Sequence, residues 1–496
     1  MLLIRLLVEE LDDRDVEPLK EALKDLESSP FDDEDEGGMS DASFFSEFAR
    51  RFDAPAEEQF LPPSRRRAVE TIVDAITASP PRPTLLVGER GAGKSAVVRE
   101  VVRSLDEEWF AFEASAPELI AGQMYTGMVD GRIQEIAERS SKRPILWVFP
   151  DFEEAFWAGQ WSRSPRGVLD SLMPYVESGA ICIVGDVEPA AYELLVRMRP
   201  KVATAFEVVR LAPLSEVEAL SVASSWVAEQ AALRVEEEAL RRTHELAAQF
   251  LPGTASPGGL LRLLKLAARQ AAQERRAAVT PAGVLETLSE ATGLPLHLLD
   301  PEKPLRLEEV RSFFAERVLG QPEAVECLVE RIAMIKAGLT DSTRPLGVFL
   351  FAGPTGTGKT EIAKTLAAYL FGSDERLIRL DMSEYQTPDS LERLLAEGRF
   401  AEGSSLIASV RRQPFSVILL DEFEKAHPKI WDLFLQVFDD GRLTDQSGRV
   451  ADFRQCVVIL TTNIGSAIPS GAAFGFAGER PSFDPAAVER AIAASF

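Results

Sequence analysis

The sequence has few of the residues that build disulfide frameworks and metal clusters. Its 496 residues include only three cysteines, Cys182, Cys327 and Cys456, and three histidines. The cysteines have no paired spacing, which argues against a disulfide framework or a zinc site and is typical of a reducing cytosol. The histidines are too scattered to indicate a metal cluster. We therefore expect a cytoplasmic protein.

Long apolar runs and an excess of basic charge are also missing. No apolar stretch approaches the ~20 residues that a membrane-spanning helix needs. The start, MLLIRLLVEELDD, is interrupted by Arg5 and followed by acids, unlike a signal peptide. Lys and Arg total 54 against 79 Asp and Glu, a formal net charge of −25. This charge repels phosphate backbones at long range, so we do not expect a nucleic acid as a partner, although a local basic channel could exist. The lack of a spanning stretch predicts no membrane partner either.

Strand-like and helix-like segments alternate along the chain, and the alternation occurs twice. The apolar runs PTLLVG, PILWVF and AICIVG are separated by helix-like stretches such as 95–105. This pattern predicts a parallel sheet with helices on both faces. A helical stretch rich in Ala, Leu, Glu and Arg follows, and the strand pattern then restarts with RPLGVFLFAG, RLIRLDMS, FSVILLDE and QCVVILTTN. The sequence therefore predicts an α/β fold of two similar modules in tandem, the first followed by a small helical domain.

Composition divides the chain into five segments. We expect an N-terminal amphipathic element over 1–29, an acidic linker over 30–62, a first α/β module over 63–214, a helical domain over 215–293 and a second α/β module over 294–496. The linker contains PFDDEDEGGMS, whose acids and glycines are typical of a solvated connection.

The second module contains a complete P-loop motif, GPTGTGKT, between a strand candidate and a helix candidate. Glycines let backbone N–H groups approach phosphates, and the helix N-terminus adds a favourable dipole. Lys359 is expected to reach the β- and γ-phosphates, and Thr360 to hold Mg²⁺. The predicted nucleotide-binding residues are Gly353, Pro354, Thr355, Gly356, Thr357, Gly358, Lys359 and Thr360. The motif therefore predicts ATP and Mg²⁺ as cofactors.

An acidic pair, Asp421–Glu422, ends the apolar run SVILL of the same module. Asp421 is a candidate Mg²⁺ ligand, and Glu422 is a candidate general base for the attacking water. Such a pair could also cap the next helix, but its occurrence after a full P-loop favours the catalytic interpretation. Asn463, at the end of VVILTTN, is a candidate γ-phosphate contact.

These segments resemble the second ATPase module of the Clp family of AAA+ protein unfoldases. The resemblance is carried by RVLGQPEAVE, RPLGVFLFAGPTGTGKTEIAKTLA, RLDMSEYQ, SVILLDEFEKAHP and VFDDGRLTDQSGRVADFRQCVVILTTNIGS, nearly unbroken over 317–466. It implies hexameric rings that grip polypeptides with pore loops and pull them through a central channel. It also implies that Val318, Leu319 and the residues to Gln321 contact adenine, and that Asn463 senses the γ-phosphate.

The first module has its own P-loop motif, GERGAGKS, which again follows a strand candidate and opens a helix. Lys94 is expected to contact phosphate and Ser95 to contact Mg²⁺. The predicted nucleotide-binding residues are Gly88, Gly91, Ala92, Gly93, Lys94 and Ser95.

Catalytic features of the family are eroded in this module. Where the family has Asp-Glu after the strand, the chain has Phe149–Pro150 or, with a shift, Asp151–Phe152. Asp151 remains a candidate Mg²⁺ ligand. The places of the family's sensor threonine and paired arginine fingers correspond to Val187–Glu188 and Thr204–Ala205. We therefore expect the first module to bind nucleotide and to hydrolyse it slowly or not at all.

Two aromatic residues are candidates for gripping substrate. ELIAGQMYTGMVDGRIQEI resembles the family's first pore loop and places Tyr125 at the gripping position, although a tyrosine packed against a helix is the alternative. The second pore loop of the family carries Gly-Tyr-Val-Gly, whereas this chain reads LLAEGRFAEGSSL. Phe400 could grip there, and it could equally be packed or idle.

Several parts of the family pattern are missing. Residues 268–293 leave no room for the coiled-coil insertion of the family's disaggregases, and the double-repeat N-terminal domain is absent. The intersubunit arginine and the second helical lid would follow Phe496, so we expect this chain as written to be a poor ATPase. The run Phe474–Gly475–Phe476 is only a weak signal for peptidase docking.

The sequence leaves three functional hypotheses. The leading one is an ATP-driven unfoldase or remodelling motor that acts on polypeptides as a homo-oligomer, expected to be a hexamer, with a peptidase or an adaptor as a further partner. The second is a non-motor AAA+ scaffold or switch controlled by nucleotide. The third is a truncated product with no activity of its own. A DNA-directed role is disfavoured by the acidic charge.

Overall fold

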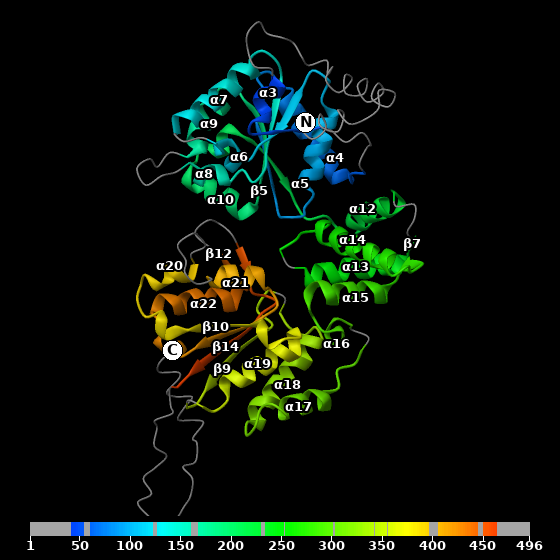
Figure 1. The fold of residues 1–496 in the computed structure, drawn as a ribbon, viewed down its shortest axis with the longest axis vertical. Helices are drawn as coiled ribbons and strands as arrows, with labels where there is room; N and C mark the ends of the chain where they lie inside the picture. The colour runs from blue at the N-terminus through cyan, green and yellow to red at the C-terminus, as the bar shows by residue number, and fades with distance from the viewer. Residues whose placement is uncertain are drawn as a thin grey trace, which may run out of the picture.

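The computed structural model describes eleven segments of the chain, and Figure 1 shows two α/β modules with a helical domain beside them. The described segments are 41–53, 60–122, 126–159, 167–229, 234–251, 253–300, 303–341, 343–354, 356–395, 405–444 and 450–463. The predicted element over 1–29, the gripping candidates Tyr125 and Phe400, the P-loop residue Thr355 and the run Phe474–Gly475–Phe476 lie outside them.

Within the described residues, the first module is built on a six-stranded sheet in the order β1-β3-β4-β5-β2-β6. The strands are β1 (Arg50–Arg51), β2 (Thr84–Gly88), β3 (Phe110–Glu113), β4 (Ile145–Phe149), β5 (Cys182–Val187) and β6 (Glu207–Leu211). All neighbours pair in parallel except β1 and β3. Strands β2 and β4 are buried at every position, as expected for strands that helices cover on both faces.

Alternate strand residues contact different helices on the two faces of this sheet. One face packs against α4 (Pro63–Ile76) and α5 (Lys94–Ser104). The other packs against α6 (Ala116–Ile120), α7 (Thr126–Ser140), α8 (Glu154–Trp157), α9 (Val168–Glu177), α10 (Pro189–Met198) and α11 (Val202–Ala205).

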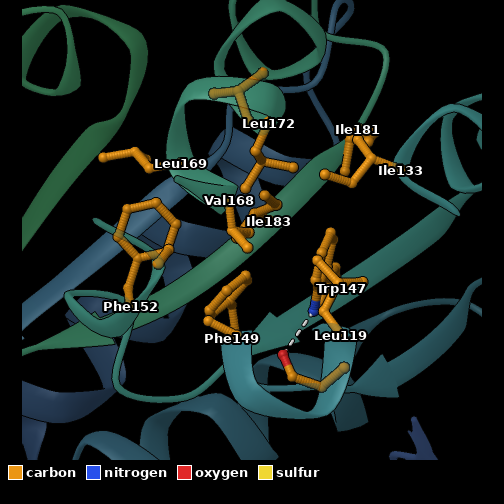
Figure 2. Close-up of a cluster of buried hydrophobic side chains, with 14 of the residues drawn as sticks. Leu119, Ile133, Trp147, Phe149, Phe152, Val168, Leu169, Leu172, Ile181 and Ile183 are labelled. Carbon is orange, nitrogen blue, oxygen red and sulfur yellow. Dashed lines mark hydrogen bonds between the residues drawn. The ribbon is translucent and has the colours of Figure 1, made fainter. Parts of the chain in front are cut away.

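Aromatic side chains fill much of that second face. Figure 2 shows Trp147 and Phe149 of β4 beside Phe152, with aliphatic residues of α9 and β5 above them. The ring centroids lie 4.9 Å apart for Trp147 and Phe149, and 5.2 Å apart for Phe149 and Phe152. The Trp147 indole N–H donates to the Ala114 carbonyl at 2.9 Å, so this buried polar group is satisfied.

A short helix, α3 (Asp41–Ser46), completes the same core from the N-terminal side. Phe45 is only 2% exposed, and its ring lies 4.2 Å from that of Phe112. Strand β1 then pairs with the edge strand β3. The linker expected over 30–62 therefore does not extend over 41–51, because apolar residues follow its acidic run and complete the first module's core.

The helical domain contains α12 (Glu216–Glu229), α13 (Glu237–Phe250), α14 (Gly258–Gln273) and α15 (Pro281–Thr292). The sequence indicated only helices here. The structure adds a parallel pair, β7 (Arg234–Val235) and β8 (Ala278–Val279), which is too short to give a periodic signal.

The second module is built on a parallel sheet in the order β10-β11-β14-β9. Its strands are β9 (Gly347–Ala352), β10 (Leu377–Asp381), β11 (Val417–Asp421) and β14 (Val457–Thr462), and β12 (Arg442–Thr444) pairs with β13 (Val450–Asp452) outside it. Its helices are α16 (Leu296–Leu299), α17 (Leu307–Ala315), α18 (Pro322–Lys336), α19 (Lys359–Phe371), α20 (Ser390–Leu395), α21 (Leu406–Arg412) and α22 (Pro428–Asp440), with 3-10 turns at Asp374–Arg376, Met382–Glu384 and Phe423–Lys425.

The two sheets share one strand order, which confirms the predicted α/β fold with two tandem modules. The order β3-β4-β5-β2 of the first sheet corresponds to β10-β11-β14-β9 of the second. In both, one strand separates the strand that precedes the P-loop from the strand that precedes the acidic segment. That middle strand is β5 in the first module and β14 in the second.

The helical domain and the second module share one hydrophobic core. Residues of α13, α14 and α15 pack in the same cluster as residues of α18, α19 and β11. Polar contacts reinforce this junction. The Arg376 guanidinium donates to the Thr292 carbonyl at 2.7 Å, and the Gln455 side chain donates to the Gln249 carbonyl at 3.1 Å.

Candidate functional site

The second P-loop has the backbone that phosphate binding requires. Helix α19 begins at Lys359, and its N-cap Gly358 has a φ of 91°. Gly356 has a φ of 83°. Side chains rarely adopt this left-handed region, so glycine is needed at both positions. The loop therefore brings backbone N–H groups to the N-terminus of a helix.

Lys359 folds back over this loop. Its ammonium group donates to the Gly353 carbonyl at 2.5 Å and to the Asn463 Oδ1 at 3.0 Å. Burial lowers the pKa of Lys359, and the neighbouring carboxylates, led by Asp421, oppose this shift. A cation held by loop carbonyls at the N-terminus of a helix fits a phosphate ligand.

The segment predicted to contact adenine lies next to the P-loop. Gln321, the N-cap of α18, donates from its side chain to the Thr357 carbonyl at 3.1 Å. Val318 is buried, whereas Leu319 is 84% exposed. An exposed leucine close to a P-loop offers an apolar surface to a nucleotide base. The role of Val318 and Leu319 as base contacts stays a prediction.

Asp421 is the last residue of β11, and two side chains from the neighbouring strands hold it. The Thr461 hydroxyl donates to Asp421 Oδ1 at 2.5 Å, and the Arg379 guanidinium contacts Oδ2 at 2.5 Å. Strands β14 and β10 flank β11, so these contacts follow from the strand order. Neither Thr461 nor Arg379 was singled out from the sequence.

Glu422 follows in the left-handed region, with a φ of 56°. Its backbone N–H donates to the Thr461 hydroxyl at 3.0 Å. Its Oε1 accepts from the Asn463 amide at 3.1 Å, and its Oε2 contacts Lys425 at 2.6 Å. The structure thus connects Lys359, Asn463 and Glu422 in one chain of hydrogen bonds.

The donors of this site fit magnesium as well as phosphate. The Thr360 hydroxyl and the Asp421 carboxylate are hard oxygen ligands of the kind that Mg²⁺ prefers. Among the described residues, no three His, Cys, Asp or Glu side chains form a preassembled metal cluster.

The first P-loop repeats this geometry. Lys94 begins α5, its N-cap Gly93 has a φ of 95°, and its ammonium group donates to the Gly88 carbonyl at 2.6 Å. Arg65, from α4, supports the loop by donating to the Ala92 carbonyl at 3.0 and 2.8 Å. The buried position of Arg65 gave no sequence signal, because it lies on a helix that the motif does not include.

The helical domain contacts the first P-loop directly through backbone groups. The Ala255 N–H donates to the Arg90 carbonyl at 2.7 Å, and the Gly258 N–H donates to the Gly91 carbonyl at 3.0 Å. A Cβ at Gly258 would lie 2.5 Å from the Gly91 Cα, so only glycine allows this approach.

Strand register defines the acidic segment of the first module. Phe149 pairs with Gly185 as Leu420 pairs with Leu460. Asp151, two residues after Phe149, has a positive φ of 47°, and Glu422, two residues after Leu420, has a positive φ of 56°. The pair that corresponds to Asp421–Glu422 is therefore Pro150–Asp151.

The register corrects both alignments that the sequence allowed, Phe149–Pro150 and Asp151–Phe152. Asp151 stands where the second module has its candidate general base. The position of the candidate metal ligand is occupied by Pro150. The sequence could not fix this register because the aromatic and proline residues after β4 obscure where the strand ends.

Three further carboxylates surround this segment. By the same register, Asp186 stands in the place of Thr461, and Glu188 in that of Asn463. Burial raises the pKa of Asp186, and Lys94 opposes this shift. Burial also raises the pKa of Glu153 to about 7. Among the described residues, Glu153 Oε2 is a buried atom without a hydrogen-bond partner.

Comparisons with known proteins agree with this architecture. Residues 344–494 match the family model described as AAA domain (Cdc48 subfamily). The chaperone protein ClpB of Vibrio cholerae is 49% identical over 213 residues, covering 41% of this chain and 24% of that protein. ClpB 1 of Nostoc sp. is 43% identical over 265 residues, covering 51% and 30%. The chain thus spans about a quarter of the length of these curated relatives.

Solved structures extend the likeness of the fold to nearly the whole chain. The Saccharomyces cerevisiae Hsp104–ADP complex has a TM-score of 0.65 at 23% identity, over 89% of this chain and 77% of that one. The S. cerevisiae Hsp104:casein complex in its extended conformation has a TM-score of 0.58 at 22% identity, over 91% and 80%. At this identity the likeness shows a shared fold.

Proposed function

We propose that this chain, whose second module belongs to the Clp family of AAA+ ATPases, hydrolyses ATP in that module and uses the energy to unfold or remodel polypeptides. The observation that carries the proposal is the hydrogen-bonded chain from Lys359 through Asn463 to Glu422. It joins a phosphate-binding cation to a carboxylate beside the P-loop.

Each residue of that chain has a distinct chemical role. Lys359 and the N-terminus of α19 neutralise phosphate charge. The Asn463 amide orients the Glu422 carboxylate, which accepts a proton from the attacking water. Thr360 and Asp421 would hold Mg²⁺, which would neutralise charge on the phosphate oxygens.

The first module binds nucleotide and hydrolyses it slowly or not at all. Its P-loop backbone and Lys94 match the second site. The position of the candidate general base holds the shorter Asp151, and Glu188 replaces the amide that orients it in the second module. A carboxylate cannot donate the hydrogen bond that Asn463 donates to Glu422.

Oligomerisation and substrate belong to the same proposal. The family resemblance supports a ring of identical chains, with six as the expected number. The Hsp104 structure in complex with casein supports a polypeptide substrate. A cytoplasmic location and a peptidase or adaptor partner stay predictions. Among the described residues, the helices are too short or too polar to cross a membrane.

Hydrolysis by matched P-loop variants tests the proposal. Lys359→Ala should abolish ATP hydrolysis by the purified chain, whereas Lys94→Ala should keep most of it. Casein should stimulate the wild-type rate, and Glu422→Gln should give ATP-dependent oligomers in sedimentation. A wild-type rate of hydrolysis in Lys359→Ala would show that the second site is not where ATP is hydrolysed. Turnover that is indifferent to casein would instead favour a nucleotide-controlled scaffold.

A further inference from the structure

The acidic end of the first site differs from that of the second by an exchange between neighbouring strands. In the second module, the carboxylate belongs to Asp421 at the end of β11, and Thr461 on β14 contacts it. In the first module, the strand corresponding to β11 is followed by Pro150, which has no carboxylate. The carboxylate is found instead on the adjacent strand β5, at Asp186.

Asp186 makes the contact that Thr461 makes in the second module. Asp186 Oδ1 accepts from the Asp151 backbone N–H at 3.2 Å. Thr461 accepts from the corresponding N–H of Glu422 at 3.0 Å. One oxygen of Asp186 therefore supports the acidic turn, and the other oxygen makes a separate contact.

That other oxygen faces the P-loop. Asp186 Oδ2 lies 3.5 Å from Lys94 Nζ, and the side chains of Asp186 and Lys94 are 26% and 10% exposed. The strand order explains this reach, because β5 lies between β2, which leads into the P-loop, and β4, which leads into the acidic turn. From β5, the Asp186 side chain therefore contacts both the P-loop lysine and the acidic turn.

We infer that Asp186 supplies the metal-facing carboxylate of the first nucleotide site in place of Pro150. This inference rests on the nucleotide-binding role proposed above for the first module. The carboxylate and the Ser95 hydroxyl are hard oxygen ligands that suit Mg²⁺. A single residue thus combines the work that Asp421 and Thr461 share in the second site.

A nucleotide-binding measurement separates this role from a simple ion pair with Lys94. In full-length protein carrying Lys359→Ala, a fluorescent ATP analogue is titrated with Mg²⁺ and with EDTA. The ratio of the affinity in Mg²⁺ to the affinity in EDTA measures how much the metal contributes to nucleotide binding. We expect Mg²⁺ to tighten binding at least about tenfold, and Asp186→Asn to reduce this ratio about tenfold. Glu207→Gln is the control, because Glu207 pairs with Thr84 at the start of β2, the end of that strand away from the P-loop, and it should change the ratio less than about twofold.

A rescue variant distinguishes loss of the carboxylate from loss of structure. Pro150→Asp combined with Asp186→Thr recreates the arrangement of the second site and should restore the Mg²⁺ ratio. Melting temperatures of all variants check folding. An unchanged ratio in Asp186→Asn, or binding by the parent that ignores Mg²⁺, would overturn the inference and leave nucleotide binding intact. If the parent bound no nucleotide, the inference and the proposed role of the first site would fall together.

Discussion

Replacing Phe45 with alanine should strongly destabilise the first module, although Phe45 lies ahead of the P-loop in the sequence. Phe45 is 2% exposed, and its ring lies 4.2 Å from Phe112 and 5.2 Å from Phe110, both on β3. Truncation of a buried phenylalanine to alanine costs about 3–5 kcal/mol. The loss falls on the face of the sheet that also carries Trp147.

Hydrogen exchange of backbone amides in the first module measures this loss of stability. Backbone amides of β3 that exchange through opening of the module should exchange at least about 100-fold faster in Phe45→Ala, because about 1.4 kcal/mol corresponds to a factor of ten. Amides of β11 in the second module provide an internal reference, since their sheet makes no use of Phe45.

Phe44→Ala is the matched control for the same helix. Phe44 is only partly buried, and its ring receives the Arg139 guanidinium at 4.5 Å. The Phe44 ring also lies 5.1 Å from Phe45 and 5.4 Å from Phe48, but it is only partly buried, so its truncation should cost less than that of Phe45 and exchange in β3 should rise clearly less than in Phe45→Ala. Equal effects of the two substitutions, or less than a tenfold change in Phe45→Ala, would refute the assignment of α3 to the core.

Three further outcomes follow from the sites. Thr461→Val removes two hydrogen bonds of the second acidic pair and should lower kcat about 10–100-fold, whereas Thr461→Ser should keep most of it. The pKa of Glu153 is about 7 in the folded chain and about 4.3 in the unfolded chain, so the folded state binds the proton more tightly. The melting temperature should therefore rise as pH falls from 8 to 5, and Glu153→Gln should make this rise smaller. Gly258→Ala, whose Cβ would lie 2.5 Å from the Gly91 Cα, should weaken first-site nucleotide binding at least about tenfold, whereas Gly259→Ala, with no neighbour nearer than 3.5 Å, should not.

The sequence was sufficient where local spacing determines the structure. A P-loop is a continuous motif, so GPTGTGKT and GERGAGKS located both loops, and the structure places Lys359 and Lys94 at the N-termini of their helices. Apolar runs bounded by breakers likewise located the central strands of both sheets. These signals are local, so they can be recognised without knowing which strands or helices lie beside them in the fold.

The sequence was insufficient where contacts cross from one strand to the next. Thr461 and Asp186 contact residues 40 and 35 positions away, and their alignment depends on where β4 and β11 end. A proline and two phenylalanines blur that end in the first module. The helix α3 was missed for a related reason, since six residues beside an acidic run are too few to show a helical period.

The helical domain is attached in different ways to the first and the second module, and this difference predicts which of the two junctions opens more readily. It meets the first module through backbone hydrogen bonds at Ala255 and Gly258 and through the buried Ala255 side chain, whereas it shares a larger apolar cluster with the second module. Because the second attachment buries more apolar residues, we expect the first one to open more readily. Opening of the junction at the first P-loop would therefore leave the helical domain attached to the second module.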